Sequence, residues 1–351
     1  MLVDGINYRT IKSNKELSYV EIIDQTALPF EFIIKRLETL DDVIESIIFM
    51  RVRGAPLIGV TAAYGIALAM NRDTSNESLE SSKTLLINSR PTAVNLSWSV
   101  NLSYKALMET DEADRIEKAW EIANNLAEDD VGKNELIGIH GSKLLKNHGS
   151  TINILTHCNA GWLATIDHGT ALSPIYKAVS EGLDIHVWVD ETRPRNQGLS
   201  LTAWELNQAN IKHTVVTDNA GGFLMQEGKV DCVLVGADRV SMSGSVCNKI
   251  GTYLKAIAAK RHGIPFYVAA PLSTVDFEFK GSNYNFEIEC RSPEEIMKIK
   301  GRDKDGRITE VTLGEFSAYN PAFDITPSEL ITNIICEKGV VEPNNIGGLI
   351  E

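Results

Sequence analysis

The sequence predicts an α/β protein with a mostly helical N-terminal part and a parallel β-sheet in its C-terminal part. The chain has 351 residues, which at about 150 residues per domain is a little more than two domains. Helical spacing of apolar residues dominates up to about residue 130, and beyond about residue 150 short apolar runs alternate with helical stretches. Repeated β–α units form a parallel sheet covered on both faces.

The N-terminal part is predicted to hold a short strand and several helices. Tyr19–Asp24 has the composition of a strand. A helix that begins near Asp41 carries four apolar residues on one face: Val43, Ile44, Ile47 and Ile48. A later helix repeats this pattern with Ile116, Ala119, Trp120, Ala123 and Leu126. The uncharged run Ala55–Met70 is short for a membrane span and contains two glycines, so we expect a buried, closely packed helix.

The C-terminal part is predicted to alternate strands with helices. The strand-like runs are Ile152–Thr156, Ile185–Val189, Thr214–Thr217, Cys232–Val235 and Pro265–Ala269. The helical stretches are Thr170–Glu181, Leu199–Gln208, Gly221–Glu227 and Lys249–His262. We expect the boundary between the two parts at 128/129, which gives domains 1–128 and 129–351.

Composition restricts the class of ligand and the compartment. The chain has 34 Lys and Arg against 47 Asp and Glu, a net charge of −13, so it has no global electrostatic attraction for nucleic acid or anionic lipid. A local basic site for a small anion remains compatible with that charge. The five cysteines form no CxxC pair, and no secretory signal is visible, which favours a reducing cytoplasm over a disulfide framework or a zinc site.

Ligands of parallel sheets bind at the carboxyl ends of the strands, so the residues that follow each strand are the first candidates. Cys158 follows the first strand and is a candidate proton carrier or nucleophile, although an inert buried thiol has the same pattern. Asp238 follows the fourth strand and is a candidate general acid, or else an ion-pair partner of Arg239. Gln197 lies in the charged loop after the second strand.

Several residues have the chemistry of a phosphate site. Asn248-Lys249 is expected at a helix start, where backbone amides and a cation attract anions. Arg53-Gly54-Ala55 precedes the buried helix, and Arg90 stands before Val94–Val100, so the two arginines would form a phosphate clamp if both face the sheet. Nucleotide, dinucleotide and HExxH motifs are absent, and the seven histidines have no metal-ligand spacing. The residues therefore indicate phosphate chemistry without nucleotide hydrolysis, dinucleotide or metal.

Several stretches together resemble the methylthioribose-1-phosphate isomerases, which belong to the superfamily that includes regulatory subunits of translation initiation factor 2B. The similar segments occur in order over nearly the whole chain: Asp24–Pro29, Arg53–Gly59 (RGAPLIG), Arg90–Asn95 (RPTAVN), Thr156–Ala164 (THCNAGWLA), Asp190–Leu206 (DETRPRNQGLSLTAWEL), Gly236–Tyr253, Ala270–Thr274 (APLST) and Asn320–Leu330 (NPAFDITPSEL).

The resemblance implies a Rossmann-like C-terminal domain, a smaller and mostly helical N-terminal domain, a homodimer and no cofactor. It implies an aldose–ketose isomerase that converts 5-methylthioribose 1-phosphate to 5-methylthioribulose 1-phosphate in methionine salvage. The family's catalytic cysteine and aspartate fall on Cys158 and Asp238. Its phosphate and substrate contacts fall on Arg53, Gly54, Ala55, Arg90, Gln197, Asn248 and Lys249, and none of these implies a metal.

Departures from the common family pattern leave the 5-substituent of the sugar open. They include Trp162, Asp167-His168, Ser173-Pro174 and Arg195-Asn196, and Trp162 is expected to narrow the sugar pocket. 5-Deoxyribose 1-phosphate is therefore an alternative substrate, and ribose 1,5-bisphosphate a weaker one. A non-catalytic regulatory protein of the initiation factor 2B type is the rival from another class. A Rossmann-type dehydrogenase is a third reading, which would require a dinucleotide fingerprint.

Overall fold

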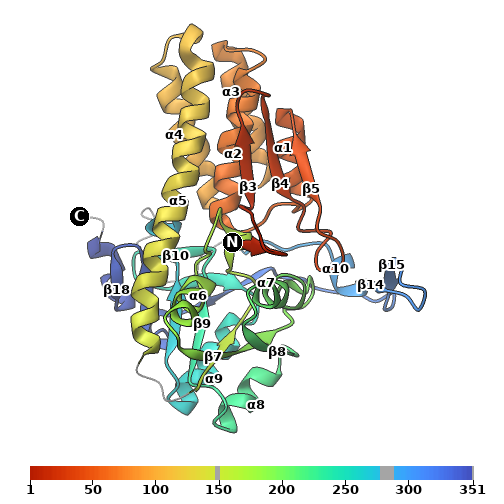
Figure 1. Cartoon of the computed structure of the whole chain (residues 1–351), viewed down its shortest axis with the longest axis vertical. Coiled ribbons are helices and arrows are strands. Elements are labelled where there is room, and N and C mark those ends of the chain that lie inside the picture. Colours follow the sequence, from red (N-terminus) through yellow and green to blue (C-terminus); the bar gives the residue numbers. More distant parts are fainter. Residues whose placement is uncertain (147–150, 277–287, 350–351) are drawn as a thin grey trace.

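The computed structural model describes residues 1–146, 151–276 and 288–349. Helices of the N-terminal part stand above an α/β part that contains the large sheet (Figure 1). Both parts of the predicted fold class are therefore present. A small hairpin near the N-terminus, β1 (Leu2–Val3) and β2 (Ile6–Asn7), lies close to where the two parts meet.

The N-terminal part consists of a three-stranded antiparallel sheet and long helices. Its strands are β3 (Ile11–Asn14), β4 (Tyr19–Ile23) and β5 (Ile34–Leu37). Its helices are α1 (Leu40–Ile48), α2 (Ala55–Met70), α3 (Asn76–Ser89), α4 (Val94–Met108) and α5 (Arg115–Leu145). The predicted strand Tyr19–Asp24 and the helix near Asp41 are confirmed. Thr39 and Asp42 form a capping box that starts α1, since each side chain accepts from the other residue's backbone N–H.

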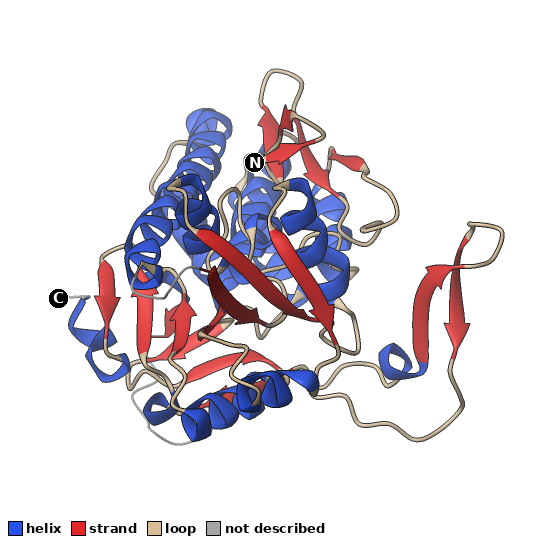
Figure 2. Cartoon of the chain, turned by 60° about the horizontal axis from the view of Figure 1, so that its bottom comes forward, coloured by secondary structure: helices blue, strands red, loops and turns tan. Residues whose placement is uncertain are grey.

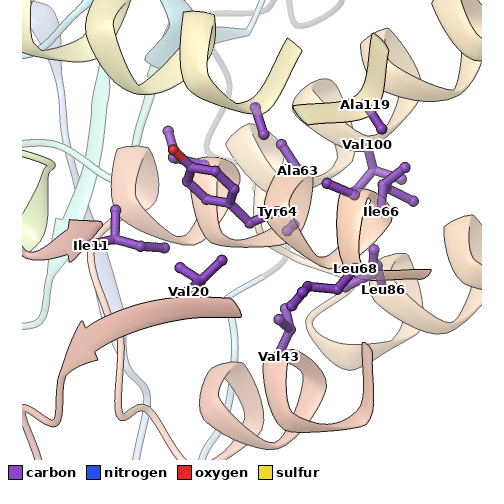
Figure 3. Close-up of a cluster of buried hydrophobic side chains, with 14 of the residues drawn as sticks. Ile11, Val20, Val43, Ala63, Tyr64, Ile66, Leu68, Leu86, Val100 and Ala119 are labelled. Atoms are coloured by element: carbon purple, nitrogen blue, oxygen red, sulfur yellow. The ribbon is translucent and has the colours of Figure 1, made fainter. Parts of the chain in front are cut away.

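The buried helix predicted from its apolar run is α2, which is the centre of the N-terminal core. Every residue from Leu57 to Met70 is buried. Figure 3 shows this core, with Val43 of α1, Leu86 of α3 and Val100 of α4 around α2. A Cβ on Gly59 would lie 2.9 Å from the Asn95 carbonyl oxygen, so α4 packs against α2 at a distance that only glycine permits. Within the described residues, no helix is both long and apolar enough to cross a membrane.

The large sheet of the C-terminal part has seven strands in the order β18-β17-β12-β9-β6-β7-β8. The five predicted strands are confirmed as β6 (Thr151–Thr156), β7 (Asp184–Asp190), β8 (Lys212–Val216), β9 (Cys232–Val235) and β12 (Phe266–Ala269). They pair in parallel. Two strands on one side of the sheet were not predicted: β17 (Asn333–Cys336) is parallel to β12, and the edge strand β18 (Gly339–Val341) is antiparallel to β17.

Helices cover both faces of this sheet, as the β–α alternation predicts. α6 (Leu172–Ser180), α7 (Ala203–Gln208) and the last turns of α5 pack on one face. α8 (Ala220–Gln226) and α9 (Thr252–His262) pack on the other. A π-helical turn over Gly198–Thr202 leads into α7, so the predicted helix 199–208 begins with a wider turn.

A second, four-stranded sheet corrects one prediction. Its order is β13-β10-β11-β16, with β10 (Arg239–Ser241), β11 (Val246–Lys249), β13 (Val275–Asp276) and β16 (Phe323–Thr326). The helix expected from Lys249 begins only at Thr252, and Asn248 and Lys249 are the last residues of β11. β11 is a strand because it pairs antiparallel with β16, more than 70 residues away along the chain, a contact that local sequence cannot reveal.

The helix α5 links the two parts, running from the helical part down the side of the sheet part (Figure 1). Ala119, Trp120 and Ala123 belong to the N-terminal core, whereas Ile137 and Leu145 belong to the core under the sheet. The boundary at 128/129 falls within this continuous helix and stays a prediction. A short helix α10 (Glu294–Met297) and a hairpin, β14 (Lys298–Arg302) and β15 (Ile308–Thr312), project to one side of the sheet part (Figure 2).

Candidate active site

Six of the nine predicted site residues line one small cavity between the start of α2 and the carboxyl ends of β6 and β9. They are Arg53, Gly54, Ala55, Cys158, Asp238 and Asn248. We call this space the inner cavity. Two neighbouring spaces share residues with it. The side cavity is lined by Ala55, Asp238 and Arg90, and the outer cavity, of about 390 Å³, is lined by Arg53 and Gln197.

Cys158 is held at the end of β6 in an uncommon backbone conformation. Its φ is +65°, in the left-handed region that non-glycine residues rarely adopt. Two threonines hold the peptide there: the Cys158 N–H donates to Thr192 Oγ1 (2.9 Å), and the Cys158 carbonyl accepts from Thr202 Oγ1 (2.7 Å). Strained residues of this kind cluster at functional sites. Cys158 is 8% exposed and lines the inner cavity. It is therefore shielded from bulk water and accessible to a ligand in that cavity.

Asp238 follows β9, and its backbone N–H donates to the Cys247 carbonyl (3.0 Å). Burial raises the pKa of its carboxyl, and the Glu289 carboxylate adds to that rise. The charges of Lys249, Arg90 and Arg53 oppose it. Arg239, the alternative partner considered for Asp238, pairs with Asp276 on β13 through Nε (2.7 Å). Asp238 is thus a buried carboxyl group whose protonated form is favoured relative to that of an exposed aspartate, with three cationic side chains near it.

Lys249 lies within the electrostatic reach of both candidate catalytic groups. Burial lowers the pKa of its ammonium group, and Cys158 and Asp238 oppose that shift. Its Nζ is 5.0 Å from the centre of the Phe323 ring on β16. The neighbouring Asn248 donates from Nδ2 to Thr252 Oγ1 (3.0 Å) at the start of α9. The two residues therefore reach the site from a strand end rather than from the helix start expected.

Arg53 and Arg90 stand on two sides of Asp238. Arg53 is 9% exposed, and its guanidinium donates to Asn159 Oδ1 (2.6 Å) and to the Asn159 carbonyl (2.8 Å). Arg90 pairs with Glu289 (3.4 Å). The predicted pair of arginines is thus brought to one site, although each lines a different cavity around Asp238.

Gly54 brings the start of α2 against the loop that follows β6. Its φ is +93°, and a Cβ there would lie 2.3 Å from the Ala164 carbonyl oxygen. No side chain caps α2, so its first-turn amides stay available where Gly54 and Ala55 line the inner cavity. The positive end of a 16-residue helix therefore faces the same space as Arg53.

Two residues of this region were not singled out from the sequence. Asn159, next to Cys158, receives both hydrogen bonds from Arg53. His157 is buried, with Nδ1 3.1 Å from Asp190 Oδ2 and Nε2 2.8 Å from the Ile250 carbonyl, so it fixes the loop after Lys249. Their position at a strand end could have identified both residues as candidates. Their hydrogen-bond partners Arg53, Asp190 and Ile250 lie far away along the chain and could not be predicted.

One group among the described residues has three potential metal-ligating atoms close together: His157, Asp190 and Asp218. Its carboxylates already have partners within the protein. Lys255 Nζ lies 2.6 Å from Asp190 Oδ2, and Asp218 accepts from the backbone N–H groups of Thr192 and Arg193, each at 2.7 Å. The chemistry of these three side chains therefore suits a buried network of ion pairs and hydrogen bonds at the carboxyl ends of the strands.

Fold and site define an α/β protein in which a cavity between two structural parts is lined by a thiol, a carboxyl group and a guanidinium group. The model of the Initiation factor 2 subunit family matches residues 51–343. A methylthioribose-1-phosphate isomerase from Sinorhizobium medicae is 50% identical, and the match covers 99% of this chain and 98% of the relative.

Two solved structures have the same architecture. The 5-methylthioribose 1-phosphate isomerase of Pyrococcus horikoshii OT3 matches with a TM-score of 0.83 at 38% identity, over 98% of this chain and 95% of that one. A chain described as translation initiation factor eIF-2B subunit delta from A. fulgidus matches with a TM-score of 0.80 at 39% identity, over 97% of each. The chain belongs to the initiation factor 2 subunit family and, within it, to the methylthioribose-1-phosphate isomerases.

The geometry around Gly54 makes a testable prediction about anion binding. Gly54→Ala is expected to weaken binding of inorganic phosphate about tenfold, because the added Cβ displaces the start of α2 from the inner cavity. Gly182→Ala is the matched control, since Gly182 also has a positive φ (+90°) but no atom within 4 Å of the added Cβ. Calorimetric titration with phosphate measures both variants. Equal affinity in Gly54→Ala and the unaltered protein would contradict the placement of the anion.

Proposed function

We propose that this protein is an aldose–ketose isomerase that converts 5-methylthioribose 1-phosphate to 5-methylthioribulose 1-phosphate, as in methionine salvage. One observation carries the proposal: Cys158 and Asp238 line the same cavity as Arg53 and the uncapped start of α2. The full-length relatives with this activity in their names support it. An anion site alone would suit any family member, whereas the thiol and acid beside it suit an isomerase.

The phosphate is proposed to bind at Arg53, Gly54 and Ala55, with Arg90, Asn248 and Lys249 around it. These groups supply cations, backbone amides and a side-chain amide, which are the donors that phosphate oxygens accept from. Gln197 is proposed to contact the sugar from the outer cavity. With the phosphate held in this way, C1 and C2 of the sugar are expected between Cys158 and Asp238.

The chemistry requires an acid first. The anomeric oxygen of the substrate carries the phosphate, so no free aldehyde exists and the ring must open before hydrogen moves. Asp238, whose protonated form is favoured by burial, is proposed to protonate the ring oxygen as the bond from that oxygen to C1 breaks. The electron pair of that bond leaves with the ring oxygen, which becomes the C4 hydroxyl.

Hydrogen then moves from C2 to C1, and two routes balance. In the proton route, Cys158 takes the proton from C2, an enediol forms, and the same proton or one from solvent is delivered to C1. In the hydride route, hydrogen and its electron pair pass directly from C2 to C1, and the C2 hydroxyl loses its proton. In both routes the C2 hydroxyl gives its proton to the Asp238 carboxylate, which restores the acid. The oxidation level of the whole sugar is unchanged, so the reaction consumes no external oxidant or reductant.

A dry site suits either route, because water would quench the intermediate. The inner cavity has a volume of about 30 Å³, far below the roughly 300–1,000 Å³ of ligand pockets. Entry of a sugar phosphate therefore requires it to join the outer cavity. Arg53 lines both cavities, so movement of its side chain, or of the helical part that carries it, would open and close the site.

The structure changes the argument about the 5-substituent. Trp162 does not narrow the pocket: it is 1% exposed and packs in a core cluster with Leu28, Leu163 and Leu201. Asp167 pairs with the N-terminal amine (3.0 Å), and Ser173 donates to the Asn134 carbonyl (2.7 Å). These departures from the family pattern thus have structural partners. Arg195 and Asn196, which also depart from the family pattern, line the outer cavity. We therefore propose that these two residues influence which 5-substituent binds.

The finer expectations on assembly and compartment are also proposals. We propose a homodimer that works in the cytoplasm without nucleic acid. The net charge of −13 supports the last point. All five cysteines are free, including the exposed Cys290, which is compatible with a reducing compartment.

The substrate proposal is tested by comparing kcat/KM for three sugars. Methylthioribose 1-phosphate is expected to exceed 5-deoxyribose 1-phosphate by about tenfold, since a methylthio group has more apolar surface to bury. Ribose 1,5-bisphosphate is expected to be the poorest. Preference for 5-deoxyribose 1-phosphate would overturn the physiological assignment within the family. Turnover of none of the three would favour a regulatory protein of the initiation factor 2B type.

The catalytic roles are tested by two conservative substitutions. Cys158→Ser and Asp238→Asn are each expected to lower kcat at least about 100-fold, the lower end for loss of a proton-transfer group, with folding and substrate affinity kept. Cys336→Ser is the matched control for the thiol, since Cys336 is buried in β17. Stopped assays by carbonyl formation measure the rates. Near-normal kcat in Asp238→Asn would remove its role as the acid.

The raised pKa of Asp238 makes a prediction about pH. The protonated form is the proposed active one, and the raised pKa extends that form to higher pH than for an exposed aspartate. We therefore expect kcat at saturating substrate to fall as pH rises through this pKa, and the residual kcat of Asp238→Asn to lack that fall. If the fall persists in Asp238→Asn, the titrating group is another one, such as Lys249.

A further inference from the structure

A buried carboxylate without a charged partner lies behind the site. Glu205 of α7 is 0% exposed, and no ion pair to it occurs within the described parts of the chain. Four neutral donors surround it. Oε1 accepts from Asn159 Nδ2 (2.9 Å) and the Leu163 N–H (3.0 Å), and Oε2 accepts from the Trp162 N–H (2.9 Å) and Tyr176 Oη (2.8 Å).

This arrangement suits an ionised carboxylate. All four neighbours donate, and only the ionised form accepts through both oxygens without a proton of its own. Burial raises the pKa of Glu205 to about 6 and the four donors oppose that rise, so the group is charged at neutral pH. The fit is also close, because a Cβ on Gly161 would overlap the Glu205 carboxylate. A glutamine at 205 would point its amide N–H groups at donors.

Asn159 connects this carboxylate to Arg53. Its Nδ2 faces Glu205, with Thr202 Oγ1 3.1 Å away, so its Oδ1 must face the opposite side. That oxygen accepts from Arg53 Nη1, and the Asn159 carbonyl accepts from Nη2. The hydrogen bond to Glu205 therefore sets the orientation of the Asn159 amide. The amide oxygen in turn sets the position of the Arg53 guanidinium. Two of the five guanidinium N–H donors are used in this way, which leaves three for a ligand.

We propose that Glu205 is a positioning residue for substrate phosphate, acting through Asn159 to hold Arg53 in the orientation that grips the anion. This inference rests on the proposed function, in which Arg53 contacts the phosphate. Glu205 touches neither substrate nor the reacting atoms. Its effect is to place a cation in advance, so that binding does not have to order a long and flexible side chain.

A purely structural role is the competing reading, and Tyr176 separates the two. Tyr176 donates from α6 to Oε2 of the same carboxylate, whereas Asn159 donates to Oε1. Tyr176→Phe removes one hydrogen bond of Glu205 and leaves Asn159 in place, so it is expected to lower stability and to leave KM within about twofold. Glu205→Gln removes the constraint on the Asn159 amide as well.

The test measures KM for methylthioribose 1-phosphate and the inhibition constant of inorganic phosphate in the full-length enzyme. Glu205→Gln is expected to raise both about tenfold, with kcat changed less than KM. In an Arg53→Ala background, Glu205→Gln is expected to add no further rise, because the residue that it positions is gone. Asn159→Ala replaces Glu205→Gln if the latter does not fold, with the same expectations.

The outcomes distinguish this inference from the function on which it rests. If Arg53→Ala raises KM and Glu205→Gln does not, the positioning role is wrong and the phosphate contact stands. Equal rises for Glu205→Gln with and without Arg53, or a raised KM with an unchanged phosphate inhibition constant, would also overturn it. If Arg53→Ala leaves both constants unchanged, the phosphate role of Arg53 falls and this inference falls with it.

Discussion

The contact between Arg53 and Asn159 is the interaction on which the rest of the site depends. Arg53 precedes α2, the central helix of the N-terminal core, and Asn159 follows β6, an interior strand of the large sheet. Their two buried hydrogen bonds join the helical part to the sheet part at the point where Cys158 lies. The thiol, the uncapped start of α2 and the guanidinium therefore share one cavity only while the two parts stay docked, which couples domain arrangement to chemistry.

Burial gives the site its electrostatic character. The same enclosure that raises the pKa of Asp238 also lowers the pKa of Lys249, so each charged form is disfavoured by loss of water and favoured by its neighbours. This balance requires charged groups from several elements. Arg53 and Arg90 come from the helical part, whereas Asp238 and Lys249 come from the sheet part. The Glu205 carboxylate, held by four neutral donors, shows that the fold satisfies a buried charge with oriented dipoles as well as with ion pairs.

Apolar runs in the sequence were enough to predict the strands and helices whose burial follows from a local pattern. The five central strands, the buried helix α2 and the helix at Asp41 follow from local pattern, since each strand of a β–α unit is buried whatever its neighbours are. The pattern failed where pairing is remote. β11 looks like a helix start in sequence and becomes a strand by pairing with β16, and β18 joins the sheet as the antiparallel neighbour of β17. Trp162 was expected to narrow the sugar pocket because it departs from the family pattern there, yet it packs in an apolar core.

The sequence by itself determined the fold class and the chemical groups of the site, because strand ends of a parallel sheet converge and their residue types can be read directly. Cys158 and Asp238 were candidates on that ground, whereas Arg53 and Arg90 were candidates because they precede the buried helix and Val94–Val100. Only the tertiary structure decided how those groups are held. The left-handed peptide of Cys158 depends on Thr192 and Thr202, and the orientation of Arg53 depends on Asn159 and, in our proposal, on Glu205. Hydrogen bonds between residues tens to a hundred positions apart leave no periodic trace in sequence, since they depend on distance in space and on the direction of each donor.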